Sequence, residues 1–299
     1  MDGQSVIEKD WCIRIATGDD NKIELSGINY PSLPQRYFGT TGDEQYDVKW
    51  SREPDLFWIS CDRYAMFQIF YSQQKDGCVL ISNTIDQLLE KGASRQLDLD
   101  ALAVFVRLGY FLSEDTPFKK IRVIPPGGKL IVKPGMIELI REQTTAKKQT
   151  HTPDRVTAKK QFGELFQDTI NSFAASHQSS DLIVPISGGR DSRHILLALN
   201  RAGVKPRHCI TCEWFAPSNN EDIPPAQELC AKLGLNHQTI SQSNDLFSAE
   251  VNGFHLTSYC ADENNWNFPV AKYYSEITGP KMLINGIAGD ILVAGLLSD

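Results

Sequence analysis

No stretch of this sequence stays apolar over the roughly 18 residues that a membrane-spanning helix needs. The longest apolar run, ILVAGLL at 291–297, is better explained as the start of a buried helix. The first residues, MDGQSVIEKDW, are polar and acidic, so they lack the features of a signal peptide. These two absences predict a cytoplasmic protein without membrane segments.

Positive charge and paired cysteines are also scarce. The lysines and arginines number 30 against 37 aspartates and glutamates, which gives a net charge of −7. This balance argues against nucleic acid or an anionic membrane as the main partner. The seven cysteines follow no disulfide spacing and favour a reducing compartment. Cys209 and Cys212 form a CxxC without the second pair that zinc needs, so we expect buried thiols on opposite faces of a strand.

Internal repeats and low-complexity segments are missing as well, and a length of 299 residues predicts two domains of about 150 residues each. Residues 1–140 consist of short β-rich runs separated by turns. We expect strands at 55–60 and 78–82. Two β-branched runs flank PPGG within residues 121–135, which predicts a hairpin there.

One helix is expected in this first part, over residues 97–112, with Asp98 or Asp100 as its cap. Its apolar face consists of Leu102, Phe105, Val106 and Leu108. Residues 141–158 are polar and have no apolar period, so we interpret them as a linker.

After residue 180 the sequence alternates between strand-like and helix-like segments. The expected strands are 181–186, 207–212, 237–242 and 282–285, and the expected helices are 192–203, 224–234 and 244–254, the last capped by Asn244. This alternation implies a parallel sheet with helices packed on it. Such sheets bind ligands at the carboxyl ends of their strands, where the strand order reverses. Glycine-rich segments at 187–191 and 286–290 follow two of these strands.

The segment VPISGGRDSRHILLAL at 184–199 places two glycines, an acid and a serine between a strand and a helix. Gly188 and Gly189 lack Cβ, so their amides can approach a ligand closely and adopt positive φ. The free N–H groups at the start of the helix complete an anion site suited to phosphate. Asp191 would hold Mg²⁺ against the phosphate oxygens. The alternative is a tight turn in which Ser187 or Asp191 caps the helix.

The chain has no GxxxxGK[ST] and no GxGxxG after a strand, so the site is of neither the ordinary kinase-like nor the dinucleotide type. Instead, SGGRDS resembles the SGGxDS pyrophosphate-binding loop of ATP pyrophosphatases, most closely that of the asparagine synthetase family. The resemblance extends to RHCITC with Thr211, to EDIPPAQELCAKLGLNHQ and to INGIAGDILVAG. The second half of the family's glutaminase domain is similar to two further segments of this chain, CDRYAMFQIFY and DLDALAVFVRLGYFLSEDTPFKKIRVIPPGGKLIV. The resemblance covers about residues 55–299.

This resemblance implies an α/β protein whose first domain is of the α+β class. Residues 1–145 would form a degenerate, glutaminase-like, β-rich domain with the layers of N-terminal-nucleophile hydrolases. Residues 155–299 would form a doubly wound ATP pyrophosphatase domain of the adenine nucleotide α-hydrolase type, truncated at its end.

The resemblance also implies the chemistry. A carboxylate attacks the α-phosphate of ATP to give an acyl-adenylate and pyrophosphate, and an amine then displaces AMP to form an amide. Asp191 and Asp290 would be the catalytic acids and would share Mg²⁺. The pyrophosphate loop would be Ser187, Gly188, Gly189, Asp191 and Ser192, and the adenosine contacts would be Ile186, Thr211, Asn285 and Gly286.

Three departures from the family pattern modify this expectation. Glutamine-using members begin Met-Cys, whereas this chain begins Met-Asp and Cys12 is internal, which predicts no glutaminase activity. Ile287 stands where the family has a glutamate that handles ammonia, which favours another amine. The chain stops at Asp299, before the family's catalytic lysine, which indicates a fragment or a degenerate copy.

These observations leave two functions open. The first is an ATP-dependent amide-forming ligase, acting in asparagine formation or as a β-lactam-forming, peptide-cyclising or polysaccharide-modifying relative. The second is a non-catalytic nucleotide-binding remnant or scaffold. The expected partners are a small-molecule or peptide carboxylate and an amine donor, with a homodimer as an open alternative.

The roles of several neighbouring residues also stay open. His194 is either a phosphate contact or, as we favour, a partly buried structural residue. Arg190 and Arg193 either add positive charge for phosphate or solvate the helix. Three aromatic residues either line a substrate pocket or, as is more common, belong to the core: Trp214, Phe215 and Trp266.

Overall fold

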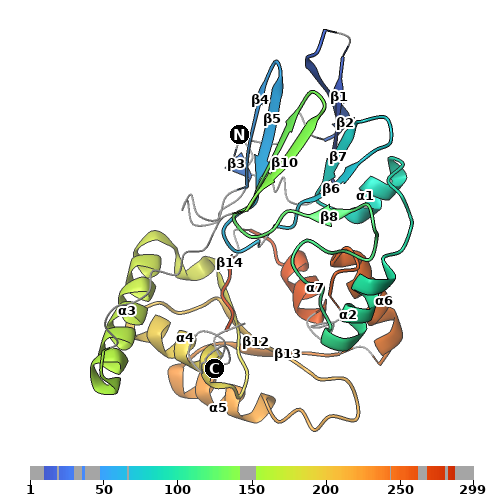
Figure 1. Cartoon of the computed structure of the whole chain (residues 1–299). Helices are drawn as coiled ribbons and strands as arrows, with labels where there is room; N and C mark the ends of the chain where they lie inside the picture. Colours follow the sequence, from blue (N-terminus) through green and yellow to red (C-terminus); the bar gives the residue numbers. More distant parts are fainter. Residues whose placement is uncertain are drawn as a thin grey trace. The chain divides into compact units, whose positions relative to one another are not determined.

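The structure is a computed structural model, and it describes residues 10–18, 20–29, 36–37, 48–65, 67–141, 153–242, 244–261, 268–279 and 282–286. The chain divides into two compact units (Figure 1). The first unit contains residues 1–147 and 251–263, and the second contains residues 148–250 and 264–299. Among the described residues, no helix is both long enough and apolar enough to cross a membrane.

The first unit contains two antiparallel sheets. In one sheet the described strands follow the order β2 (Ile23–Ile28), β1 (Cys12–Thr17), β7 (Val79–Ser82), β6 (Phe70–Gln73) and β8 (Arg122–Val123). In the other the order is β10 (Met136–Ile140), β9 (Lys129–Lys133), β5 (Leu56–Ser60), β4 (Val48–Glu53) and β3 (Arg36–Tyr37). The strands expected at 55–60 and 78–82 are therefore confirmed as β5 and β7.

Alternation of side chains along the strands builds the core of the first unit. Ile13 and Ile15 of β1 are buried in one cluster with Phe57 and Ile59 of β5, which belongs to the other sheet. The alternate residues of the β1–β7–β6 sheet pack on its other face against Leu88 of α1 (Ile85–Glu90). Each fully buried side chain of this size contributes about 1.5–3 kcal/mol to folding.

The prediction of a hairpin within 121–135 is wrong. Its two β-branched runs form β8 and β9, and these strands belong to different sheets. The Ile124 amide donates to Ile69 of the first sheet, whereas the Gly128 carbonyl accepts from Cys61 beside the second. Pro125 and Pro126 have no N–H to donate to a ladder. The PPGG segment therefore carries the chain from one sheet to the other.

The helix expected over 97–112 is shorter and more exposed than its period suggests. α2 spans Leu99–Leu108, and the Asp98 carboxylate caps it by accepting from the Ala101 amide. Only Ala101 is buried. Of the expected apolar face, Leu102 and Phe105 are half-buried, whereas Val106 is 85% exposed and Leu108 is 42% exposed. The expectation is therefore wrong for Val106 and Leu108.

The second unit is built on a parallel sheet. The order of its described strands is β13 (His237–Ile240), β12 (His208–Cys212), β11 (Leu182–Pro185) and β14 (Met282–Leu283). β11 pairs with β12 on one side and with β14 on the other, so the strand order reverses at β11. This confirms the alternating strand and helix pattern and the parallel sheet expected from it.

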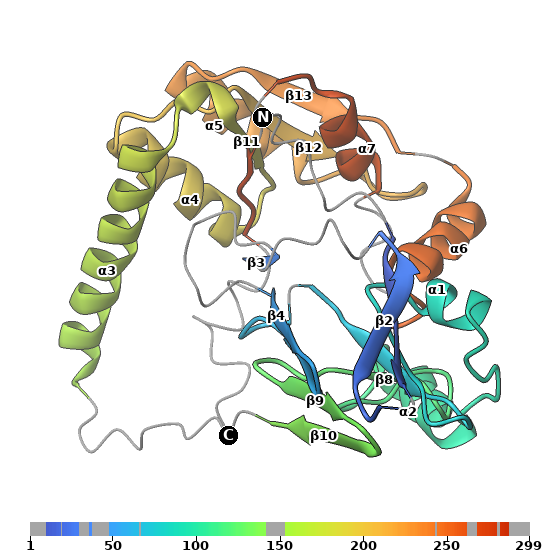
Figure 2. The ribbon, with the colours of Figure 1, turned by 90° about the horizontal axis from the view of Figure 1, so that it is seen from above.

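Helices cover both faces of this sheet (Figure 2). One face packs against α3 (Arg155–Ser176), α4 (Arg190–Arg201) and α5 (Ile223–Leu233), and the other against α7 (Phe268–Glu276). Cys209 lies in the first cluster and Cys212 in the second, which confirms two buried thiols on opposite faces.

Two local expectations after residue 140 need correction. α3 begins at Arg155 with Asp154 as its cap, so the linker expected over 141–158 is too long at its end, and residues 142–152 lie outside the described residues. α6 (Leu246–Leu256) is capped by Asp245, whose carboxylate accepts from the Ser248 amide, and not by Asn244.

Candidate functional site

A cavity of about 550 Å³ opens at the carboxyl ends of β11, β12 and β14. It lies where the strand order reverses, which is where doubly wound sheets bind their ligands. The structure brings most of the expected site residues to its wall: Ile186, Ser187, Gly189, Asp191, Ser192, Thr211, Asn285 and Gly286. Gly188 lies beside the cavity, and Asp290 lies outside the described residues, as does Ile287.

The loop after β11 is held in shape by its own hydroxyl groups. The Ser187 amide donates to Ser192 Oγ at 3.1 Å, and the Gly189 amide donates to Ser187 Oγ at 3.1 Å. The two serine oxygens are also 3.1 Å apart. Ser192, which is buried in the first turn of α4, thus anchors the beginning of the loop.

The amide groups at the start of α4 have no side-chain cap. Gly189 is the cap residue of this helix, and it makes no side-chain cap hydrogen bond. Uncapped N–H groups at a helix start, together with the helix dipole, favour an anion. The alternative in which Ser187 or Asp191 caps the helix is therefore wrong.

The positive φ expected for the two glycines of the loop is wrong. Gly189 has φ −67° and ψ 159°, and neither Gly188 nor Gly189 has a positive φ. A Cβ on Gly188 would lie 3.0 Å from Asp222 Oδ1 and 3.1 Å from Pro225 Cγ. Close packing against the start of α5, and not a left-handed backbone, is what requires glycine at residue 188.

Gly286 presses the chain after β14 against the first turn of α4. A Cβ at this residue would lie 2.8 Å from the Ser192 amide nitrogen and 3.1 Å from the Asp191 carbonyl carbon. Distances under 3.0 Å to backbone atoms do not occur without a shift of the main chain. Glycine here lets the two segments of the cavity wall meet.

Thr211 and His237 stiffen the part of the cavity wall that β12 contributes. Thr211 Oγ1 donates to the Ile186 carbonyl at 2.7 Å and lies 2.8 Å from His237 Nε2. Burial lowers the pKa of His237, so the ring is neutral near pH 7. Because the Thr211 hydroxyl donates its only proton to the Ile186 carbonyl, it can only accept from His237. His237 therefore carries its proton on Nε2 and donates to Thr211 Oγ1.

Asp222 and Trp214 are the site residues that sequence reasoning missed or left open. Asp222 Oδ1 accepts from the Gly188 amide at 2.8 Å, and Oδ2 accepts from Trp214 Nε1 at 3.2 Å. Both residues line the cavity. The structure thus settles Trp214 as a cavity residue, whereas Phe215 does not line the cavity and Trp266 lies outside the described residues.

One part of the cavity wall is mostly apolar. It comes from β12 and α7, through Cys212, Val270, Ala271 and Tyr274. Burial raises the pKa of Cys212 to about 11, so this thiol stays protonated at neutral pH. No sequence signal marked α7 as part of the site, because its period is that of any helix packed on a sheet.

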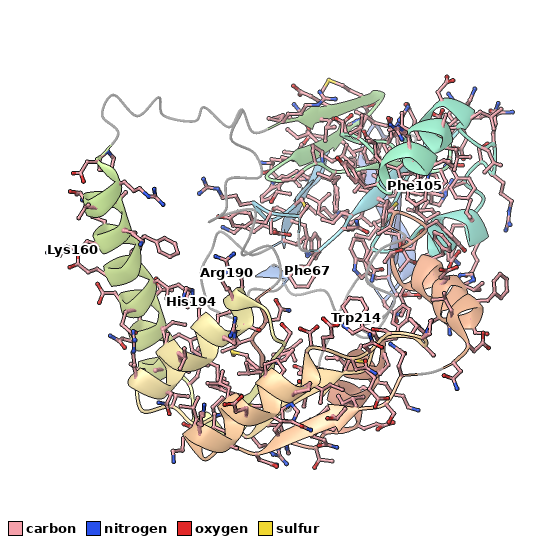
Figure 3. The ribbon with its side chains drawn as sticks, turned by 90° about the horizontal axis from the view of Figure 1, so that it is seen from below. Phe67, Phe105, Lys160, Arg190, His194 and Trp214 are labelled. Carbon is pink, nitrogen blue, oxygen red and sulfur yellow. The ribbon has the colours of Figure 1, made fainter. Side chains whose placement is uncertain are left out.

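His194, Arg190 and Arg193 lie on the other side of α4 from the cavity. Together with Lys232 they line a separate groove of about 380 Å³ between α4 and α5. Figure 3 labels Arg190 and His194 on α4, and the His194 ring is 6.5 Å from the Phe166 ring of α3. His194 is exposed, not partly buried. Arg193 contributes to the loop only by donating from Nε to the Gly189 carbonyl at 2.9 Å.

The described residues contain no group of three or more His, Cys, Asp or Glu side chains placed to share one metal ion. Magnesium bound together with nucleotide phosphates needs only one or two protein carboxylates, however. Asp191 lines the cavity beside the anion site, whereas both oxygens of Asp222 already accept hydrogen bonds from Gly188 and Trp214. The donor set that the structure describes therefore fits Mg²⁺ that arrives with a nucleotide.

A family model described as asparagine synthase matches residues 161–298. The matched segment contains all four strands of the parallel sheet and every lining residue of the cavity. No curated protein matches the chain.

Proposed function

We propose that the chain is a member of the asparagine synthase family, whose model matches residues 161–298, and that it is an ATP-dependent ligase that joins a carboxylate to an amine. The carboxylate oxygen bonds to the α-phosphorus of ATP and pyrophosphate leaves. The amine nitrogen then bonds to the acyl carbon, AMP leaves, and the nitrogen loses a proton. The observation that carries the proposal is the uncapped start of α4 beside a 550 Å³ cavity at the reversal of the strand order.

We assign the two ends of the cavity to the two ends of ATP. The loop 187–192 and the first turn of α4 supply N–H and hydroxyl groups for the pyrophosphate. Adenosine would contact Ile186, Thr211, Asn285 and Gly286, where the rigid Thr211–His237 pair supports the wall. Hydrogen-bond donors that are already in place need no reorganisation when charge develops on the leaving group.

Asp191 would hold Mg²⁺, with Asp290 as the second carboxylate. Bound magnesium would neutralise charge on the phosphates. Asp191 lies in the first turn of α4, next to the uncapped amides, so its carboxylate faces the same ligand as the anion site. A carboxylate there would repel phosphate if no cation lay between them.

We further propose that the first unit is glutaminase-like, with the layers of N-terminal-nucleophile hydrolases, but hydrolyses no glutamine. Its facing antiparallel sheets support the fold assignment. Cys12 lies inside the chain at the start of β1 and is only 1% exposed. Burial raises the pKa of its thiol to about 11, so a nucleophilic thiolate is absent at neutral pH. Glutamate release from glutamine, measured with wild type and Cys12→Ala, tests this: release that Cys12→Ala abolishes contradicts it.

A reducing compartment, the cytoplasm, is part of the same proposal. All seven cysteines are free thiols, six of them buried. The carboxylate and amine partners, and a homodimer, stay predictions.

Exchange of labelled pyrophosphate into ATP tests the ligase proposal. The exchange is measured with a panel of carboxylates, aspartate first, and with wild type, Asp191→Asn and Asp168→Asn. We expect carboxylate-dependent exchange that Asp191→Asn lowers about 100-fold, because it loses charge at the reacting phosphates. Asp168 lies exposed on α3, so Asp168→Asn is the control and should exchange as wild type does.

The acid that supports exchange decides between the candidate functions. Exchange with aspartate favours an asparagine-type reaction, whereas exchange only with another acid favours a natural-product or polysaccharide substrate. ATP binding without exchange for any carboxylate would contradict the ligase and leave the nucleotide-binding scaffold.

A further inference from the structure

The Asp222 carboxylate joins two parts of the cavity wall that are far apart in the sequence. One oxygen accepts from the Gly188 amide at 2.8 Å, across 34 residues, and the other accepts from the Trp214 indole N–H at 3.2 Å. Gly188 belongs to the phosphate loop, and Trp214 forms part of the wall after β12. A single side chain therefore sets the distance between the loop and the aromatic wall.

The start of α5 explains why this carboxylate is available. Asp222 is the cap residue of α5, yet its side chain makes no cap hydrogen bond. A capping aspartate accepts from the second or third amide of its helix. In α5 these residues are Pro224 and Pro225, which have no N–H. The carboxylate thus has no donor in its own helix and turns to Gly188 and Trp214.

The packing around Gly188 is shaped for this contact. A Cβ there would come within 3.0 Å of Asp222 Oδ1 and within 3.1 Å of Pro225 Cγ. The glycine and the two prolines consequently serve one arrangement: the prolines free the carboxylate, and the missing side chain lets it reach the loop amide. Trp214 is fixed from a second side, since its backbone amide donates to Asn220 Oδ1 at 2.6 Å.

We propose that Asp222 is the positioning residue of the nucleotide site, an inference that rests on the function proposed above. Its carboxylate holds the Gly188 amide and the Trp214 indole in the geometry that ATP meets. The Gly188 amide is then no phosphate donor. The pyrophosphate binds to the remaining loop groups and to the uncapped amides of α4, while the Trp214 ring keeps its place in the wall.

Calorimetric titration of Mg²⁺-ATP into four variants tests the proposal. Asp222→Ala removes both contacts and should weaken ATP binding at least about tenfold, the effect of losing a hydrogen bond to a charged group. Asp222→Asn keeps the shape and one acceptor, so it should restore part of the affinity. Trp214→Phe keeps a ring but loses the N–H and should lie between wild type and Asp222→Ala. Glu221→Gln changes the neighbouring exposed acid and should bind ATP as wild type does.

Trp214 fluorescence gives a second readout that needs no nucleotide. The chain has five tryptophans, so the Trp214 signal is the difference between the emission of each protein and that of its Trp214→Phe counterpart. Asp222→Ala should shift this difference emission, because the indole loses its carboxylate partner, whereas Glu221→Gln should leave it unchanged. Circular dichroism verifies that each variant is folded.

A different variant separates the proposal from a simple loss of folding. Pro224→Ala introduces an N–H at the second residue of α5 that competes for the Asp222 carboxylate. We expect this exposed substitution to keep or raise the melting temperature while it weakens ATP binding. A variant that merely loses its fold would instead lower the melting temperature and the ATP affinity together.

Three results would overturn the proposal. Tighter ATP binding by Asp222→Ala would show that the carboxylate competes with phosphate for the Gly188 amide. Unchanged affinity, with or without an emission shift, would show that the contact does not position the site. Wild-type protein that binds no ATP would overturn the proposed function itself, a result that none of the variants can mimic.

Discussion

Glycines 188 and 286 determine the shape of the site through the side chain that they lack. Neither adopts the left-handed backbone that usually explains a required glycine. Each instead allows another segment to approach: the Asp222 carboxylate at Gly188, and the first turn of α4 at Gly286. The loop, α4 and the chain after β14 are thus in contact at the site proposed for phosphate.

We predict that Gly286→Ala impairs the site more than any surface substitution. The added Cβ would lie 2.8 Å from the Ser192 amide nitrogen, so the main chain must move, at a cost of about 1–3 kcal/mol. ATP affinity, measured by calorimetry, should fall together with the melting temperature. Gly163→Ala is the control, because a Cβ there meets nothing within 4 Å and should stabilise α3 by about 0.5–1 kcal/mol. ATP binding of Gly286→Ala at wild-type affinity would contradict the prediction.

At the residue level the sequence predicted which positions meet, but not all that they do. Residues from loop 187–192, from β12 and from the segment after β14 line one cavity, as strand ends of a parallel sheet must. Asp222 escaped notice because its role depends on a partner 34 residues away. A local pattern indicates a helix cap there, and only the two prolines that follow indicate otherwise.

Among the elements, α2 shows what helical periodicity can and cannot tell. Its period and its Asp98 cap were both predictable, since each depends on neighbouring residues. What covers its apolar side was not, because coverage depends on distant segments. Phe105 stacks on Phe111 with ring centroids 4.7 Å apart and lies 6.5 Å from Phe254, whereas Val106 points outward. For the same reason the pattern around PPGG indicated a hairpin and could not reveal that its two strands join different sheets.

We expect Val106→Glu to leave the free energy of unfolding within about 0.5 kcal/mol of wild type, because the side chain is already 85% exposed. Ala101→Glu, on the buried side of the same helix, should cost several times more, since a charge would replace a methyl group that is 4% exposed. Urea unfolding of both variants measures the difference. Equal destabilisation would mean that the outward face of α2 is covered in solution.

For the whole molecule, the notable feature is that residues 251–263 belong to the first unit although they follow most of the second. The Tyr259 hydroxyl donates to Asp86 Oδ1 at 2.5 Å, and Ser258 Oγ accepts from the Ile85 amide at 3.4 Å. Burial and the Asp86 carboxylate raise the pKa of Tyr259 to about 12, so the hydroxyl remains a donor. Sequence patterns predicted the helix that leads into this segment but carried no sign of the unit it joins.

Tyr259→Phe should therefore lower the free energy of unfolding of the first unit by about 1.5–3 kcal/mol, the worth of a hydrogen bond to a charged group. Two-probe urea unfolding checks this, and ATP affinity should stay at the wild-type value because the cavity lies in the second unit. Tyr110→Phe, at a tyrosine that is 54% exposed, is the matched control. A variant that loses ATP binding but keeps its stability would argue against this division of roles.

The return of residues 251–263 also imposes an order on synthesis. As the ribosome extends the chain, the strands β11, β12 and β13 are translated before the last part of the first unit exists. The first unit therefore cannot complete its fold while it is the only unit made, and β14 is added to the parallel sheet later still. Folding during translation must leave both units unfinished at once, and a gene cut after residue 147 would encode a first unit that lacks its partner for Asp86.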